Sequence, residues 1–67
     1  MCLSTIYYAD DKKHEEPLAE DVTEVRIRDG CLVFTDLIGA DTEIAGDIEC
    51  IDFVRSYITV RRPEGTA

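Results

Sequence analysis

The sequence predicts an all-β fold, a small antiparallel barrel or strongly bent sheet of five to six short strands. Several short runs are rich in β-branched and aromatic residues, an Asp-Gly pair separates two runs of alternating hydrophobicity, and no stretch has a convincing helical period. With 67 residues the chain has room for a single domain, residues 1–67, with a small core. Dimerisation or a bound metal is the natural supplement to a core of this size.

The N-terminal part is predicted to contain one strand followed by a charged loop. Residues 2–8 lack glycine and proline and are rich in β-branched and aromatic side chains, which is typical of a strand. Residues 10–17 carry seven ionisable groups and no apolar side chain that would hold them against a core, so we expect a solvated loop. Residues 18–21 are interpreted as a turn.

The clearest local signal is Asp29-Gly30, which lies between alternating runs over residues 23–28 and 31–36. An Asp-Gly pair in this position predicts a hairpin with a two-residue turn, and such a turn fixes the register of the two strands. The predicted cross-strand pairs are Arg28 with Cys31, Ile27 with Leu32, and Val25 with Phe34. The expected core face therefore carries Val25, Ile27, Leu32 and Phe34, and the opposite face carries Arg26, Arg28, Cys31 and Val33.

Glycines and a shift in the hydrophobic pattern divide the second half of the chain. Gly39 and Gly46 bracket a short strand over residues 42–45, in which Ile44 is the expected core residue. Residues 47–54 predict a longer strand whose alternation shifts midway, and a bulge near Glu49 or Cys50 accounts for the shift. A turn at residues 55–56 then pairs Phe53 with Ile58 and Ile51 with Val60, and residues 61–67 form a tail.

The charge of the chain disfavours nucleic acid as a partner. There are 15 acidic and 7 basic residues, which gives a net charge of -8, and residues 29–52 contain no basic side chain. A protein that binds a phosphate backbone needs clustered lysine and arginine. No apolar run approaches the length of about 20 residues that spans a bilayer, and the N-terminus lacks a signal peptide. We expect a cytoplasmic protein that does not enter the membrane.

No set of residues predicts catalysis, so we expect a protein that is not an enzyme. His14 is interpreted as a solvated loop histidine, because the sequence places no nucleophile beside it. The acidic residues lack the spacing of a calcium loop and are interpreted as a solvated surface. The tyrosines Tyr7, Tyr8 and Tyr57 are expected to cap the core or fill an interface rather than to stack on bases.

Cys2 is the candidate metal ligand. If Met1 is removed, the Cys2 amine and thiol close a chelate ring on a metal, and two chains together supply two nitrogen and two sulfur donors. If Met1 is retained, its amine, the Cys2 amide and the Cys2 thiolate form a tridentate donor. Flat sets of nitrogen and sulfur donors suit Ni(II) or Cu(II), whereas zinc prefers a tetrahedral set. The alternative is that Cys2 is simply a small apolar residue at the start of a strand.

The other two cysteines, Cys31 and Cys50, are expected to be structural. They lie far apart in the sequence and lack the spacing of a zinc site, and in a reducing compartment they remain thiols. Each is flanked by strand residues, so we interpret both as buried or half-buried packing residues. The hairpin register places Cys31 beside Arg28, outside the main core, which also fits packing at a subunit contact.

Four segments of the sequence together resemble the CooT family of small nickel-binding proteins. They are Met1-Cys2-Leu3-Ser4, Val25-x-Ile27-x-Asp29-Gly30, Gly46-x-Ile48-x-x-Ile51-Asp52-Phe53 and Ile58-x-Val60. The resemblance implies a cytoplasmic homodimer of SH3-like barrels that supplies nickel to carbon monoxide dehydrogenase. It also implies a nickel site built around the cysteine after the initiator methionine, which is Cys2 in this chain.

The sequence therefore supports two hypotheses of different classes. In the first, the protein is a nickel metallochaperone in which the Cys2 residues of a homodimer meet near the two-fold axis and bind one Ni(II) per dimer. His14 joins this site as an additional ligand only if its loop folds back to the N-terminus. In the second, the protein is a small acidic interaction module that binds protein or RNA without a metal.

Overall fold

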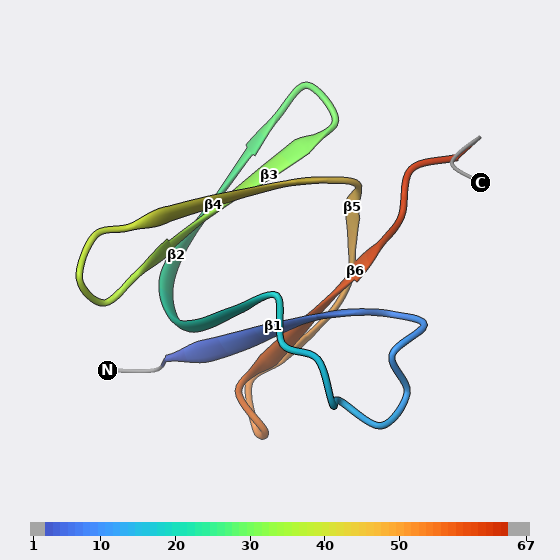
Figure 1. Cartoon of the computed structure of the whole chain (residues 1–67), viewed down its shortest axis with the longest axis horizontal. Coiled ribbons are helices and arrows are strands. Elements are labelled where there is room, and N and C mark those ends of the chain that lie inside the picture. Colours follow the sequence, from blue (N-terminus) through green and yellow to red (C-terminus); the bar gives the residue numbers. More distant parts are fainter. Residues whose placement is uncertain (1–2, 65–67) are drawn as a thin grey trace.

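Six strands in one sheet make up the computed structural model, which describes residues 3–64 (Figure 1). This confirms the all-β prediction. The sheet order is β4-β3-β2-β1-β6-β5, and the described residues contain no helix, hence none that is long and apolar enough to cross a membrane. The strand bounds are β1 Ser4–Tyr8, β2 Ala19–Arg28, β3 Cys31–Asp36, β4 Asp41–Ala45, β5 Asp47–Asp52 and β6 Tyr57–Arg61.

The hairpin of β2 and β3 forms around Asp29-Gly30 in the predicted register. Arg28 pairs with Cys31, and the two pairs that follow are also those expected from a two-residue turn. Asp29 and Gly30 have φ values of 31° and 80°. Positive φ at both central residues is the signature of a type I′ turn, whose twist matches that of the two strands. The local turn chemistry therefore determines this half of the fold.

Two residues of the hairpin depart from their expected faces. Ile27 is 71% exposed, because β2 continues past its pairing with β1 and the tip of the hairpin extends away from the rest of the sheet (Figure 1). Val33 is buried although it lies opposite the core. It pairs with Arg26 on one side and Glu43 on the other, and long charged side chains cover apolar neighbours with their methylene groups.

The core lies on the concave side of the curved sheet and draws on five strands. Ile44 is part of it, as predicted, and Phe34, Leu32, Ile6 and Val60 are the largest fully buried side chains. The remaining buried members of the cluster are Val22 and Ile58. Thr59 is buried on the other face, and its hydroxyl has no hydrogen-bond partner within residues 3–64.

The turn between β5 and β6 is longer than predicted. Ile51 pairs with Ile58 and Asp52 with Tyr57, so residues 53–56 form the turn and Phe53 has no partner strand. The reason is the Asp52 side chain, whose Oδ1 accepts hydrogen bonds from the Val54 and Arg55 amides at 2.9 and 2.8 Å. Such side-chain capping stabilises a wider turn. The predicted bulge lies between Ile48 and Cys50.

The first and last strands lie side by side in the middle of the sheet and run parallel. Thr5 pairs with Tyr57 and Tyr8 with Val60. The sheet is therefore mixed, not purely antiparallel as predicted. The expected turn over residues 18–21 is also incorrect, because β2 begins at Ala19 and the Leu18 amide donates a 2.7 Å hydrogen bond to the Ile6 carbonyl. Part of the predicted first strand, Cys2, lies outside the described residues.

Gly46 joins the two edge strands of the sheet. β4 and β5 stand at opposite ends of the strand order, yet Gly46 is the single residue between them. The sheet must therefore curl until its two edges approach each other at this point, although it does not close into the predicted barrel. The Gly46 amide donates a 3.0 Å hydrogen bond to the Gly30 carbonyl, and a Cβ at residue 46 would collide with the Arg61 carbonyl oxygen.

We predict that Gly46→Ala destabilises the fold by at least twice as much as Gly30→Ala. Both glycines have positive φ, so each alanine costs about 1 kcal/mol or more in backbone strain. Only at residue 46 must the main chain also move, because open space surrounds Gly30. Urea unfolding of the two variants measures the difference, and equal midpoints would contradict the role assigned to Gly46.

We also predict different costs for two residues that pair with each other across the hairpin. Leu32→Ala should cost about 2–5 kcal/mol, because Leu32 is 1% exposed and its removal leaves a cavity. Ile27→Ala should change the stability of the monomer by no more than about 0.5 kcal/mol. Thermal and urea unfolding at low protein concentration test this pair, and a large effect at Ile27 would refute its exposed placement.

Candidate functional site

The predicted metal ligand, Cys2, lies outside the described residues, as does Met1. The nearest described secondary structure is β1, which begins at Ser4, two residues later. Ser4 lines a groove of about 240 Å³ together with Val22, Thr23, Glu24, Val25, Ile51, Phe53 and Ile58. The groove at the start of β1 is therefore mostly apolar.

Apolar side chains beside this groove are unusually exposed. Phe53 is 81% exposed and Val54 is 93% exposed, both in the turn between β5 and β6. Ile51, at the end of β5, is also exposed. Ile51 and Phe53 both line the groove, and exposed large apolar side chains that lie together are typical of a contact with another molecule. The hydrophobic pattern predicts Phe53 in a strand, paired with Ile58, and the capping of the turn by Asp52 explains why it is unpaired and exposed instead.

His14 belongs to an aromatic cluster and is not a solvated loop residue. Its ring stacks on Tyr7 with a centroid distance of 4.2 Å and an interplanar angle of 12°, and it meets Tyr57 edge-on at 4.6 Å. Aromatic pairs of this geometry are stabilising. Tyr7 is three residues after Ser4, about 10 Å along the strand. The contacts therefore hold the His14 ring against β1 beside Tyr7, about 10 Å along the strand from Ser4.

The parallel pairing of β1 and β6 brings these rings together. Tyr7 and Tyr57 point to the face opposite the core, since Ile6 and Ile58 between them in the ladder point inward. The loop from Ala9 then folds back over this face, with the His14 amide donating a 3.1 Å hydrogen bond to the Asp11 carbonyl. The sequence could not indicate this contact, because it depends on two strands at opposite ends of the chain.

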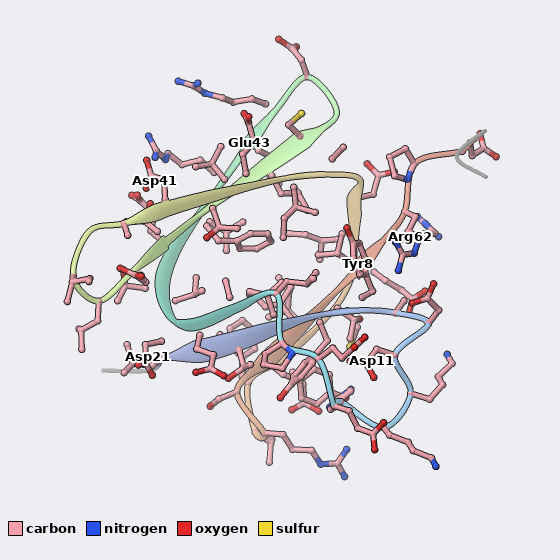
Figure 2. The ribbon with its side chains drawn as sticks, in the orientation of Figure 1. Tyr8, Asp11, Asp21, Asp41, Glu43 and Arg62 are labelled. Atoms are coloured by element: carbon pink, nitrogen blue, oxygen red, sulfur yellow. The ribbon has the colours of Figure 1, made fainter. Side chains whose placement is uncertain are left out.

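Tyr8 lies on the core side of β1 and forms a second contact with the C-terminal segment. It packs against the core cluster, as expected, and the Arg62 guanidinium lies 3.7 Å from the centre of its ring (Figure 2). Arg62 Nε donates a 2.9 Å hydrogen bond to Asp10 Oδ2. This hydrogen bond lowers the pKa of the Asp10 carboxyl and raises the pKa of the Arg62 guanidinium. The three side chains tie the loop after β1 to the end of β6.

We predict that Arg62→Met returns the pKa of Asp10 toward its ordinary value of 3.8. The ion pair stabilises the folded chain above this pH and is lost as the pH falls through the lower folded value. Carboxyl NMR titration of Asp10 measures the shift, with Lys13→Gln as a variant of equal charge change. Identical titration midpoints in the parent and Arg62→Met proteins would refute the assignment.

The remaining cysteines lie on different surfaces. Cys31 is half-buried at the start of β3, between Arg28 and Ala45 in the sheet, which fits a packing residue. Cys50 is exposed, contrary to the packing interpretation. It follows the bulge in β5 and pairs with Thr59 on the face opposite the core, where the sheet edge leaves it uncovered. Both thiols are free.

Acidic side chains in the described residues serve turns and surface ion pairs. Asp36 Oδ1 accepts hydrogen bonds from the Ile38 and Ala40 amides. The Asp41 carboxylate accepts hydrogen bonds from the Arg26 guanidinium and the Thr35 hydroxyl. Asp41 and Glu43 lie on β4, far from the Tyr8–Arg62 pair (Figure 2). Within residues 3–64 no three histidine, cysteine, aspartate or glutamate side chains are grouped as a metal site would require.

The described part of the chain thus defines a small curved-sheet protein with an apolar groove that is lined in part by Ser4, the first residue of β1. Residues 1–61 match a family model described as CO dehydrogenase accessory protein CooT, and the chain therefore belongs to the CooT family. This confirms the resemblance seen in the sequence. Comparison with curated proteins and with solved structures gave no match.

Proposed function

We propose that this protein is a nickel metallochaperone for carbon monoxide dehydrogenase maturation, which carries Ni(II) through Cys2 at a homodimer interface. The match to the accessory-protein family carries the proposal, because it begins at residue 1 and so includes Met1-Cys2. The role requires no catalysis, and we infer that the protein is not an enzyme. It also requires reduced thiols, as in the cytoplasm.

The groove beside Ser4 supports the dimeric form of the site. Its lining is largely apolar and includes the highly exposed Phe53. In a dimer with two-fold symmetry the same surface of both chains is buried, so a contact along this groove would bring the two N-terminal segments together. One cysteine from each chain is then sufficient for a shared site.

The donor chemistry supports nickel as the cargo. A thiolate combined with the amine or amide nitrogens of Met1-Cys2 gives the flat nitrogen and sulfur set that suits Ni(II). The Cys2 thiol must lose its proton to bind the metal, so the affinity for Ni(II) should decrease as the pH is lowered. We propose one Ni(II) per dimer. His14 is not needed in this set, because the thiolates and the amine or amide nitrogens of the two chains already supply the donors.

We predict that Ni(II) titration of the protein saturates at one metal per two chains, with the charge-transfer absorption of planar thiolate-bound nickel. The N-terminus is first verified by mass. Cys2→Ser should abolish this spectrum, whereas Cys50→Ser should retain it although Cys50 is the exposed thiol among the described residues. Zinc competition distinguishes the preferred metal.

Binding that is indifferent to Cys2 would contradict the nickel proposal. The alternative hypothesis, a small acidic module that binds protein or RNA without a metal, would then be favoured. Partner binding by such a module should be retained in the Cys2→Ser variant.

We predict that Phe53→Ser weakens the dimer by at least about tenfold, while Ile38→Ser does not. Both residues are highly exposed and lie in turns, but only Phe53 lines the groove. Buried aromatic side chains dominate the energetics of contacts between proteins. Analytical ultracentrifugation over a range of concentrations gives the dissociation constants. Equal constants for the two variants would place the dimer contact elsewhere.

A further inference from the structure

A second pocket lies on the opposite face of β1 and β6 from the core. Its volume is about 480 Å³, and it is built from β1, the loop after β1, the β5–β6 turn and the start of β6. The proposed nickel function uses none of its side chains. The lining residues are Thr5, Tyr7, Lys12, His14, Arg55, Ser56 and Tyr57.

The pocket has the opposite charge to the protein as a whole. The chain contains 15 acidic residues among 67, yet none of the lining residues is acidic. Two of them, Lys12 and Arg55, are cations, and the others include hydroxyl groups and the imidazole of His14. Such groups donate hydrogen bonds, and donors that carry a charge bind anionic oxygens most strongly. The lining lacks the carboxylates and thiolates that would favour a metal cation.

The cations are available to a ligand. Within residues 3–64, Lys12 takes part in no ion pair, and the single ion pair of Arg55 is with Asp52 at 3.8 Å. This contact is long and is made by Asp52 Oδ2, and the Arg55 side chain is 75% exposed. Most of the hydrogen-bond donors of Arg55 therefore remain unused.

The aromatic and backbone walls of the pocket are fixed without a ligand. The ring of His14 is held between Tyr7 and Tyr57, and its backbone has a φ of 54°. The Thr5 amide donates a 3.0 Å hydrogen bond to the Ser56 carbonyl, which joins β1 to the β5–β6 turn. A pocket that is already ordered loses less conformational entropy when it binds a ligand.

We propose that this pocket binds a small oxyanion, a carboxylate or phosphate group. Lys12 and Arg55 supply the opposing charge, and the hydroxyls of Thr5, Ser56 and the tyrosines supply neutral donors. The strongly acidic surface elsewhere excludes a long polyanion such as nucleic acid, because the two cations here cannot offset its repulsion. The ligand is therefore a compact anion whose charge is confined to the pocket.

The test is an NMR titration of the full-length, metal-free protein with phosphate and, separately, with citrate at constant ionic strength. The proposal expects saturable shifts at the amides of the lining residues, with a dissociation constant on the order of 1 mM or tighter for at least one anion. The anion that saturates identifies phosphate or carboxylate as the preferred group. The variant Lys12→Gln/Arg55→Gln should weaken its binding at least about tenfold.

The matched control is Lys13→Gln/Arg28→Gln, which removes the same charge from exposed positions outside the pocket. It should bind the anion as the parent protein does. Equal weakening by the two double variants would reveal a general charge effect and overturn the proposal. The absence of saturation with both anions would also overturn it, and so would shifts centred on Arg26 and Arg62. Since these spectra are recorded without nickel, neither result depends on the function of Cys2.

Discussion

The curvature of the sheet depends on the close approach of Gly46 to the main chain of β6. β4 and β5 are the two edges of a six-stranded sheet, and a linker of one residue forces these edges together. The space at residue 46 admits no side chain, because the Arg61 carbonyl occupies the place of a Cβ. The concave face created by this bend encloses Phe34, Leu32 and the other core residues, so that a chain of 67 residues obtains a core from one sheet.

Local signals in the sequence predicted the local parts of this fold. Asp29-Gly30 determined both a turn type and the register of the strands around it, and the slip in the apolar pattern located the bulge before Cys50. The parallel pairing of β1 with β6 left no local signal. The turn after Asp52 was also missed, because its width depends on side-chain hydrogen bonds and not on hydrophobicity.

The candidate sites divide in the same way. The candidate metal ligand Cys2 can be recognised in the sequence, because its residue type and its position after Met1 indicate it. The family match includes both residues. The aromatic contacts of His14 and the pocket beside it were not predictable. They require the loop after β1 to cross two strands that meet only in the folded chain. In the sequence this loop is a charged segment without apolar side chains, whereas in the structure its His14 forms one side of the pocket.

The central position of β1 has a consequence for synthesis of the chain. β1 is the first of the six strands to be synthesised, and its parallel partner β6 is the last of them. Because β1 joins the halves of the sheet, the core cannot be completed until β6 has been synthesised, and folding must wait for contacts of high sequence separation. β1 consequently remains without its parallel partner while the four strands between them in the chain are being synthesised.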